Sequence, residues 1–313
     1  MFENYYGFKK KPFSLTPDPE FFYLSQDHME AIEHLIYGIS EGEGFLLLAG
    51  EIGTGKTTLC RVITQKLRPS IIYSMVLNPF QDFPGLLQSI IKDFGLIPKS
   101  EDKSDLMDQL IGFLLNEVGP KGKTALIIID EAQNLSVETL EQLRLLSNIE
   151  TNKEKLIQIL LLGQEELIQK LELKELRQLN QRISVKYFLT PLKKKEATQY
   201  IAHRIQVGNP LRKIKFTRAA LRRIYKYTRG VPRLINMLAH RCLVAGFVTE
   251  SSTIDRAMVK RAKESLFGGK YDLIRKIKDK GYESKDLDPE MMLPNVSEIL
   301  GNVEPQGVTG ESG

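Results

Sequence analysis

The segment from Gly50 to Thr57 constrains the fold of this chain more than any other. It reads GEIGTGKT and fits the pattern G-x-x-x-x-G-K-[S/T] in full. An apolar run, residues 44–49, precedes it, and a helical pattern, residues 56–67, follows it. In that context glycines let backbone N–H groups point at phosphate oxygens, and the helix N-terminus adds favourable partial charge. A chance glycine-rich turn is the alternative, but the strand-to-helix context favours a phosphate-binding loop.

Two side chains of this loop have expected tasks. Lys56 is expected to neutralise the β- and γ-phosphates of a nucleotide, and the hydroxyl of Thr57 to hold Mg²⁺. The full set of residues that we expect to contact a nucleotide is Gly50, Glu51, Ile52, Gly53, Thr54, Gly55, Lys56, Thr57, Thr58 and Asp130. The four histidines are scattered, so no metal site besides nucleotide-bound Mg²⁺ is expected.

Strand and helix patterns alternate through the first 190 residues. All of the strand candidates except the last read as mostly apolar rather than alternating, which is typical of strands covered on both faces. The pattern therefore predicts an α/β domain with a parallel sheet. Asp27 and Glu30 resemble a capping pair at the start of the first long helix. The expected strands are 44–49, 71–77, 125–130, 156–162 and 184–189; further helices are expected near 56–67, 84–94, 104–118, 136–150 and 164–182.

The pattern changes at Thr190–Pro191. Thr190 can cap a helix that begins at Pro191, and only helical periodicity follows to about residue 266. One of these helices is expected to open at Thr217. The last residues are poor in large apolar side chains and are expected to be largely disordered. The predicted organisation is an N-terminal aromatic segment with the first helix (1–43), an α/β core (44–190), a helical domain (191–266) and an acidic tail (267–313).

Two adjacent acids follow the apolar run ALIII. Asp130, at the end of that strand, can hold Mg²⁺ through water, and Glu131 can orient and deprotonate an attacking water. The alternative is an ordinary acidic turn, which the upstream loop disfavours. The second acid favours hydrolysis over phosphoryl transfer to a small molecule, so a small-molecule kinase is disfavoured.

Four further polar residues stand at predicted element ends. The amide of Gln164 can reach the γ-phosphate or the water, or it can simply begin a helix. Arg182 or Arg177 can stabilise charge on the phosphate bound by a neighbouring subunit, and surface ion pairs are the alternative. Arg233, in the sequence GVPR, can reach back to the nucleotide, or it can be a solvated residue at the start of a helix.

Composition excludes several classes of protein. The 313 residues suffice for two domains, and an ordinary globular composition, 42% hydrophobic and 27% charged, excludes wholesale disorder. Two distant cysteines exclude a disulfide framework and fit a reducing compartment. The longest apolar runs are far shorter than the roughly 20 residues that a membrane helix needs, and the N-terminus lacks the apolar core of a secretory signal. We therefore expect a cytoplasmic protein.

The charge is divided unevenly along the chain. Residues 1–190 carry 20 basic and 26 acidic side chains, whereas residues 191–265 carry 18 basic and 4 acidic ones. Arg218, Arg222, Lys226 and Arg229 fall on one helical face. That face can be merely solvated, it can bind nucleic acid or anionic lipid, or it can contact the acidic core of a neighbouring copy.

These motifs together resemble the AAA+ ATPase superfamily. Within it the chain is similar to the ExeA/GspA-type secretion ATPases and their relatives in pilus and polysaccharide assembly. The resemblance covers roughly residues 1–266 and rests on the opening from Tyr6 to Ser25 and on the sequences GQEEL, LRQLNQRI and GVPRLIN. It implies a P-loop NTPase with a Rossmann-like parallel sheet and a helical lid, ATP hydrolysis and ATP-linked homo-oligomerisation.

The resemblance also implies roles for single residues. Gln164 matches sensor 1, Arg182 the arginine finger that acts on a neighbouring subunit, and Arg233 sensor 2, while Arg177 is the less favoured finger. Longer members of the family continue into a membrane helix and a peptidoglycan-binding domain, whereas this chain ends in a short acidic tail. The expected function is an ATPase that energises or regulates an envelope assembly, with an inner-membrane protein as partner. The alternative is a DNA-associated regulator of the type that assists transposases.

The aromatic N-terminus has two interpretations. Its tyrosines and phenylalanines can form a flap over an adenine ring, or a strap that covers the edge of the sheet. The strap is the favoured interpretation. These aromatic residues are Tyr5, Tyr6, Phe8, Phe13, Phe21, Phe22 and Tyr23.

Overall fold

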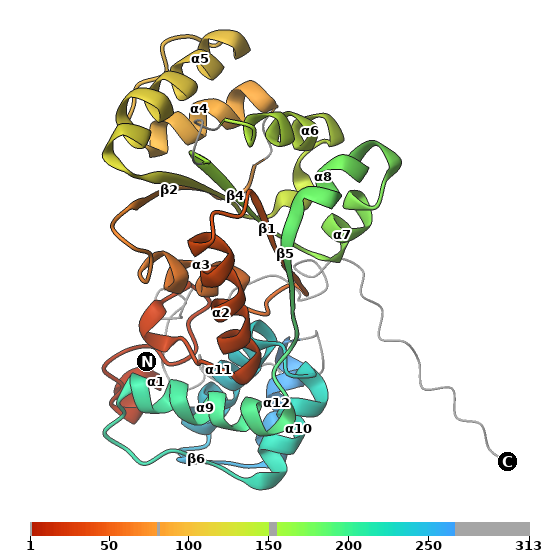
Figure 1. Ribbon diagram of the computed structural model, residues 1–313. Coiled ribbons are helices and arrows are strands. Elements are labelled where there is room, and N and C mark those ends of the chain that lie inside the picture. Colours follow the sequence, from red (N-terminus) through yellow and green to blue (C-terminus); the bar gives the residue numbers. More distant parts are fainter. Residues whose placement is uncertain (1, 80–81, 150–154, 267–313) are drawn as a thin grey trace, which may run out of the picture. The chain divides into compact units, whose positions relative to one another are not determined.

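The computed structural model describes residues 2–79, 82–149 and 155–266. These residues form two compact units (Figure 1). The sheet unit comprises Leu24–Thr190, and the helical unit combines residues 2–23 with residues 191–266. The expected tail, residues 267–313, lies outside the described residues.

A five-stranded parallel sheet forms the centre of the sheet unit, as the sequence predicts. The strands lie in the order β2-β3-β4-β1-β5, so the chain crosses over between strands rather than returning through hairpins. Every residue of the two central strands β1 and β4 is buried, whereas the edge strand β5 alternates between buried and exposed positions. The strands are β1 (Phe45–Gly50), β2 (Ile71–Val76), β3 (Thr124–Ile129), β4 (Ile157–Gly163) and β5 (Ile183–Leu189).

Helices cover both faces of this sheet. On one face α2 (Gln26–Ser40) packs on β1 and β5, and α3 (Lys56–Thr64) packs on β1. A Cβ atom at Gly38 of α2 would lie 2.7 Å from side-chain atoms of both Leu46 and Val185, so this close approach requires glycine. The other helical elements of the unit are α4 (Phe83–Asp93), α5 (Lys103–Phe113) with a π-turn (Leu114–Val118), α6 (Val137–Leu146), α7 (Glu165–Leu171) and α8 (Arg177–Arg182). Short 3₁₀ turns occur at Gly119–Lys121, Ala132–Asn134 and Lys174–Leu176.

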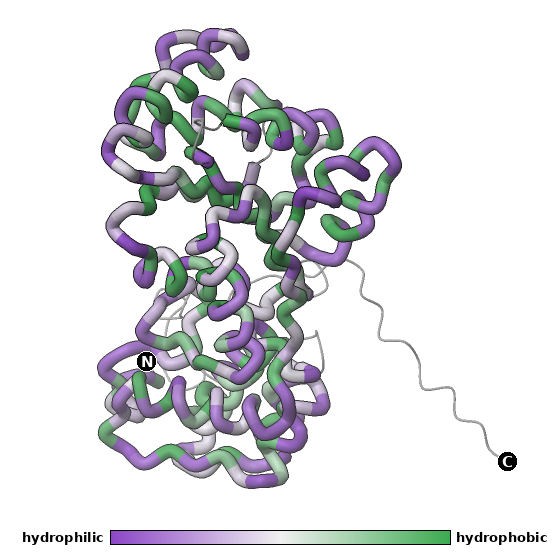
Figure 2. Tube along the Cα trace, in the orientation of Figure 1, coloured by the Kyte–Doolittle hydropathy of each residue, from purple (hydrophilic) through white to green (hydrophobic). Residues whose placement is uncertain are grey.

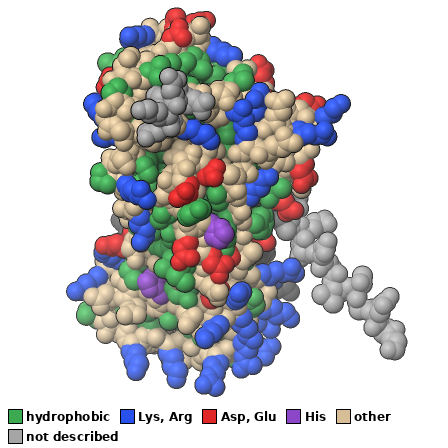
Figure 3. Space-filling model, in the orientation of Figure 1, with side chains coloured by type: hydrophobic (Ala, Val, Ile, Leu, Met, Phe, Trp, Pro, Cys, Tyr) green, Lys and Arg blue, Asp and Glu red, His purple; other side chains and the backbone are tan. Residues whose placement is uncertain are grey.

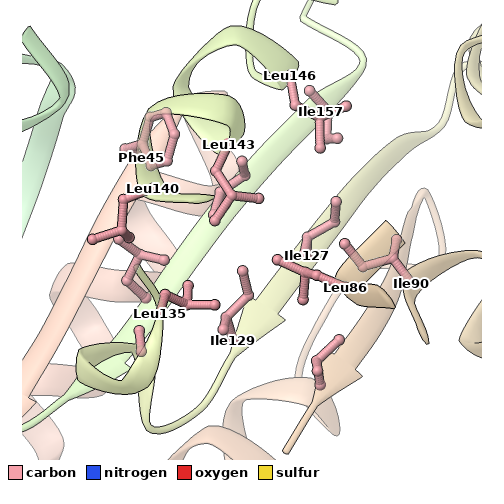
Figure 4. Packing of buried hydrophobic residues seen from close by; sticks show 14 of the residues in the cluster. Phe45, Leu86, Ile90, Ile127, Ile129, Leu135, Leu140, Leu143, Leu146 and Ile157 are labelled. Atoms are coloured by element: carbon pink, nitrogen blue, oxygen red, sulfur yellow. The ribbon is translucent and has the colours of Figure 1, made fainter. Parts of the chain in front are cut away.

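The main hydrophobic core lies between the sheet and the helices of the second face. Ile127 and Ile129 of β3 point toward Leu86 of α4 and Leu143 of α6 (Figure 4). Because alternate residues of a strand point to opposite faces, positions 45, 47 and 49 of β1 join this core while 46 and 48 face α2 and α3. The green strands in Figure 2 show why the sequence of these strands reads as apolar throughout.

The helical unit is built around the buried helix α11 (Pro232–Val248). Around it lie α9 (Lys194–Gly208), α10 (Arg218–Thr228) and α12 (Arg256–Leu266), which contact it directly. Thr217 caps α10 as predicted, through a bond from the backbone N–H of Ala220 to its hydroxyl. The expectation of purely helical structure was wrong, because the two-residue strands β6 (Lys215–Phe216) and β7 (Thr253–Ile254) pair in parallel. Such short pairs leave no periodicity in the sequence.

The predicted segment 1–43 is divided between the two units. Residues 1–23, with α1 (Phe2–Tyr6) and a 3₁₀ turn (Pro19–Phe21), belong to the helical unit, whereas α2 belongs to the sheet unit. The aromatic residues of this segment pack within the helical unit, so the strap over the sheet edge and the flap over adenine stay predictions. Phe2, Tyr6 and Phe13 join the core around α11, and the Tyr6 hydroxyl donates to the carbonyl of Leu243.

Arg204 of α9 binds the N-terminal segment from within the helical unit. Its Nε donates to the carbonyl of Pro12 and its Nη2 to the carbonyl of Ser14 at 3.0 Å. Its guanidinium also lies 4.6 Å from the centre of the Phe21 ring. Because Arg204 is only 7% exposed, these contacts satisfy a buried charge and fix the segment on the helical unit.

Two predicted helix caps are wrong. The N-cap of α2 is Ser25 rather than Asp27, because the Ser25 hydroxyl accepts the N–H of His28. Thr190 does not begin a helix, since α9 starts at Lys194. Instead the N–H and the hydroxyl of Thr190 both donate to Asp27, at 2.7 and 3.1 Å. Within the described ranges, none of the helices has the length and apolar character that crossing a membrane requires.

Candidate functional site

Three neighbouring strands bring the predicted site residues to one edge of the sheet. Strand β4 lies between β1 and β3, and all three run in parallel. The phosphate-binding loop follows β1, Asp130 follows β3, and Gln164 follows β4. The carboxyl ends of these strands therefore gather side chains that are far apart in the sequence, which is where parallel α/β sheets bind ligands.

Glycine gives the loop after β1 its shape. Gly53 and Gly55 have φ angles of 79° and 105°, which side chains other than glycine rarely adopt. Thr54 between them is buried, and its hydroxyl donates to the carbonyl of Glu51 at 2.8 Å. The sequence predicted these glycines as phosphate-contacting residues, and their conformations fit a loop whose backbone wraps a ligand.

Lys56 lies inside the loop rather than in solvent. Its Nζ donates to the carbonyls of Gly50 and Glu51 at 2.8 and 3.0 Å, and the residue is 6% exposed. Burial lowers the pKa of its ammonium, while the nearby carboxylates of Glu131 and Asp130 act to raise it. A buried ammonium held only by carbonyls gains strongly from an anion, so phosphate oxygens are better acceptors for it than its present partners.

Thr57 and Asp130 meet at the start of α3. The Thr57 hydroxyl donates to Oδ2 of Asp130 at 2.5 Å, and Oδ1 of Asp130 accepts the N–H of Glu131 at 2.9 Å. Asp130 is 4% exposed, and burial raises the pKa of its carboxyl, while the bond from Thr57 opposes that shift. A hydroxyl and a carboxylate in contact supply the oxygen ligands that Mg²⁺ prefers, so this pair fits the predicted metal role.

Glu131 stands in a strained turn directly after Asp130. Its φ of 52° and ψ of 39° are left-handed, a conformation uncommon for a residue other than glycine. Its Oε2 accepts bonds from the side-chain amides of Gln133 and Gln164, at 2.5 and 3.0 Å. The turn thus separates the two acids: Asp130 contacts the loop, while Glu131 contacts the end of β4.

Gln164 is part of this cluster, and Gln133 is a member that the sequence did not indicate. The backbone N–H of Gln164 donates to Oε1 of Gln133 at 3.2 Å. Gln133 therefore contacts both Glu131 and Gln164, the two residues of the cluster that the sequence did indicate. Its own position is fixed by Lys170 of α7, which donates to the carbonyls of Gln133 and Leu135. A neutral amide in a turn carries no sequence signal that would separate it from other surface glutamines.

The two predicted arginines of the sheet unit do not join this cluster. Arg182, at the end of α8, is exposed and its Nη1 donates to Asn148 and to the carbonyl of Arg144, at the end of α6. Arg177 is exposed at the start of α8. Arg233 belongs to the helical unit, where it is the second residue of α11 and partly exposed.

His28 is a second residue that the sequence analysis did not assign to the site. Its Nε2 lies 3.3 Å from the carbonyl oxygen of Thr54 in the middle of the loop. The ring is buried on the first turn of α2, and its Nδ1 lies 2.6 Å from the hydroxyl of Ser25. In the sequence His28 lies in the first turn of a predicted helix, which gives no sign of a contact with the loop.

Comparisons with known proteins agree with this architecture. Residues 39–171 match the family model described as AAA domain, so the chain contains an AAA domain. The chain is 39% identical over 269 residues to general secretion pathway protein A of Aeromonas hydrophila, which covers 86% of this chain and 49% of that protein. The predicted resemblance is therefore confirmed, and the chain spans about half the length of that relative.

Solved structures share the fold at low sequence identity. The ORC2 protein of Aeropyrum pernix, solved with ADPNP and ADP, aligns with a TM-score of 0.61 and 18% identity, covering 82% of this chain and 71% of that one. The ORC1 protein of the same organism, solved in complex with DNA, aligns with a TM-score of 0.62 and 14% identity, covering 83% and 71%. The predicted AAA+ type of P-loop fold is confirmed.

Proposed function

We propose that this chain binds ATP and hydrolyses it to ADP and phosphate. The proposal is supported by its AAA domain and by the similarity of 86% of the chain to general secretion pathway protein A. One observation carries this proposal: Lys56, the Thr57–Asp130 pair and Glu131 stand together at one edge of the sheet, although they come from two separate strands. The nucleotides in the ORC2 structure support the same class of ligand.

Each residue of the site then has a task for which its chemistry is suited. The loop N–H groups and Lys56 bind the phosphates, and Thr57 and Asp130 hold Mg²⁺. When bound, Mg²⁺ neutralises phosphate charge. Glu131 accepts the proton of the attacking water, because its carboxylate is the one not bonded to the loop. Gln164 donates through its amide and orients either that water or the terminal phosphate.

Two substitutions test this assignment. Lys56→Ala is expected to lose ATP binding, because it removes the buried cation that faces the phosphates. Glu131→Gln is expected to retain ATP but to lose turnover, because an amide cannot accept the proton. Equilibrium binding of labelled ATP and release of inorganic phosphate separate the two steps. Normal ATP affinity in Lys56→Ala contradicts the loop assignment, and wild-type turnover in Glu131→Gln removes Glu131 as the base.

We propose further that ATP binding drives self-association and that Arg182 acts on the nucleotide of a neighbouring copy, with Arg233 responding to the nucleotide bound in its own chain. Arg182 is exposed at the end of a short helix, as a residue that acts between chains must be. The unequal charge of residues 1–190 and 191–265 supports contact between the helical unit of one copy and the sheet unit of the next. Arg182→Ala should bind ATP normally and hydrolyse it poorly. Mixing it with Glu131→Gln should restore some activity, and absence of rescue at any ratio contradicts action between chains.

The proposed biological role is to energise or regulate an envelope assembly from the cytoplasm, through an inner-membrane partner protein. The similarity to general secretion pathway protein A supports this role. Because the chain spans about half of that relative, the partner cannot be carried over from it by name. A pull-down with the ATP-trapped Glu131→Gln variant tests the proposal, and recovery of envelope proteins only when ATP is present is the expected result. Recovery of the same proteins without ATP contradicts it.

A second candidate, a DNA-associated regulator, is favoured by one feature of the helical unit. Arg218, Arg222, Lys226 and Arg229 are all exposed on or next to α10. Lys and Arg side chains crowd the edge of the molecule where α10 and β6 lie (Figure 3). A salt titration of duplex DNA binding, with and without ATP, tests this candidate. ATP-dependent binding at physiological salt that weakens when these residues are replaced supports it, and no binding excludes it.

A further inference from the structure

The first turn of α2 contacts the phosphate-binding loop through one buried side chain. Nε2 of His28 lies 3.3 Å from the carbonyl oxygen of Thr54, and Nδ1 lies 2.6 Å from the hydroxyl of Ser25. The three residues are each no more than 3% exposed. Water therefore does not compete for these bonds, and each buried polar atom depends on the partner that it has here.

The chemistry of the partners fixes the imidazole. A carbonyl oxygen can only accept a hydrogen bond, so Nε2 of His28 carries the hydrogen toward Thr54. In the neutral imidazole Nδ1 then accepts from the Ser25 hydroxyl, whose oxygen in turn accepts the backbone N–H of His28. Ser25 thus caps the helix and orients the ring with the same hydroxyl. The neutral ring has one tautomer and one orientation that satisfy all three contacts.

Holding the Thr54 carbonyl has a consequence for the next residue of the loop. In a trans peptide the C=O of one residue and the N–H of the following residue point in opposite directions. The bond from His28 to Thr54 therefore directs the N–H of Gly55 away from α2. A Cβ atom at Gly55 would lie 3.4 Å from Nε2 of His28, so the ring packs beside this peptide. Phosphate loops bind through backbone N–H groups, which makes the direction of this N–H important.

The chain passes between its two units twice, at Tyr23–Leu24 and at Thr190–Pro191, and the first turn of α2 lies next to both crossings. Asp27 accepts the N–H and the hydroxyl of Thr190, the last residue of the sheet unit, and accepts the hydroxyl of Tyr187 at 3.0 Å. The first crossing, between Tyr23 and Leu24, directly precedes Ser25. Both connections to the helical unit therefore leave the sheet unit next to one turn of α2.

We infer that His28 is a positioning residue for the phosphate-binding loop and that the first turn of α2 couples nucleotide occupancy of this loop to the two chain crossings. The inference rests on the proposed nucleotide-binding function and adds a residue and a path that the loop motif does not contain. His28 contacts the loop backbone, so its role is to hold the loop ready for phosphate rather than to take part in the reaction.

Nucleotide affinity in matched variants tests the positioning role. Loss of one such bond corresponds to about a fivefold change in an equilibrium constant. His28→Leu should therefore raise the dissociation constant of ADP and the KM for ATP about fivefold, while kcat changes less than about twofold. His28→Gln, whose amide can still donate to Thr54, should recover most of the affinity. The control is His240→Leu, which removes a buried histidine of the helical unit and should leave nucleotide affinity unchanged.

Three results overturn the positioning role. They are an unchanged dissociation constant in His28→Leu, a glutamine variant no better than the leucine variant, and an equal loss in the His240→Leu control. If His28→Leu fails to fold, Ser25→Ala provides the second test, because it leaves the ring without its fixed orientation. A rise of at least twofold in the dissociation constant of ADP supports the role, and an unchanged value overturns it.

Hydrogen exchange tests the coupling without any measurement of activity. Addition of ADP to the wild-type chain should slow exchange in peptides that contain the amides of His28 and Thr190, the two donors at the crossings. His28→Leu, measured at ADP concentrations that saturate it, should lose this protection at Thr190. Protection at Thr190 that persists in the variant, or that is absent from the wild-type chain while ADP is bound, overturns the coupling. A wild-type chain that does not bind ADP at all instead contradicts the proposed function.

Discussion

Replacement of Asp130 by asparagine should stabilise the nucleotide-free protein and destroy its response to Mg²⁺ and ATP. Asp130 is 4% exposed, and burial is the largest influence on its carboxyl, whose pKa it raises. Asparagine has the same shape and can keep both contacts: its oxygen accepts the N–H of Glu131, and its amide donates to the Thr57 hydroxyl.

The magnitude follows from two opposing terms. A hydrogen bond to a charged group contributes about 1.5–3 kcal/mol and a neutral one about 1 kcal/mol, so two bonds lose roughly 1–4 kcal/mol together. Removing a buried carboxylate recovers several kcal/mol of desolvation, and the loss of its attraction to the Lys56 ammonium offsets part of that gain. The expected net effect is a stabilisation of about 0.5–2 kcal/mol, the range of single stabilising substitutions, and 1 kcal/mol corresponds to about 2–4 °C in the Tm of a unit this size.

The pH dependence provides an independent check of the cause. Because the folded-state pKa of Asp130 is raised, the folded protein binds more protons than the unfolded chain, and its stability falls as the pH rises through that pKa. The Tm of the variant should therefore exceed that of the wild-type protein at neutral pH, and the difference should shrink toward the ordinary pKa of aspartate near pH 4.

The assay is thermal unfolding from pH 4 to 8, with and without Mg²⁺ and ADP. Asp108→Asn is the control, because that residue is exposed on α5 and its replacement should change stability by less than about 0.5 kcal/mol. A variant less stable than the wild-type protein at neutral pH refutes the argument about burial. A variant that Mg²⁺ and ADP still stabilise as strongly as the wild type refutes the assigned role.

Three further predictions follow from contacts in the two units. Gln164→Ala should leave ATP affinity within about twofold and lower kcat at least tenfold, because it removes a donor from Glu131 at the end of β4; equal kcat in a phosphate-release assay contradicts this. Gly55→Ala should weaken ADP binding at least tenfold in calorimetry, since its φ of 105° is unfavourable for alanine and its Cβ would contact His28, and unchanged affinity contradicts this. Arg204→Met should cost about 2–4 kcal/mol in urea unfolding and expose residues 1–23 to protease, because the carbonyls of Pro12 and Ser14 lose their donor; an intact, protected segment contradicts this.

The strand positions could be predicted because buried parallel strands leave a strong signal. In β1, β3 and β4 nearly every side chain is buried, so each strand reads as a mostly apolar run. The order of the strands places Gly50, Asp130 and Gln164 together once the sheet is parallel. The proximity of these residues therefore follows from their places at the carboxyl ends of parallel strands. Their catalytic roles stay predictions.

Contacts between distant segments could not be predicted. The Tyr6 hydroxyl contacts the carbonyl of Leu243 at a separation of 237 residues, and no local pattern in the sequence reveals that pairing. The position of Gln133 depends on the left-handed turn at Glu131. A left-handed turn is expected from the sequence where glycine stands, and glutamate gives no such indication. The Ser25 cap is not evident in the sequence because Asp27 and Glu30 resemble a capping pair, whereas Asp27 binds Thr190.

The most direct test of the account is the release of inorganic phosphate from ATP by the concentrated wild-type protein in the presence of Mg²⁺, measured beside Lys56→Ala and Glu131→Gln. The account predicts continuous release by the wild-type chain and none above background by either variant, with ATP retained by Glu131→Gln alone of the two. Phosphate release that is absent from the wild-type chain, or equal in all three proteins, contradicts the claim that the loop after β1 and the acids after β3 form an ATPase site.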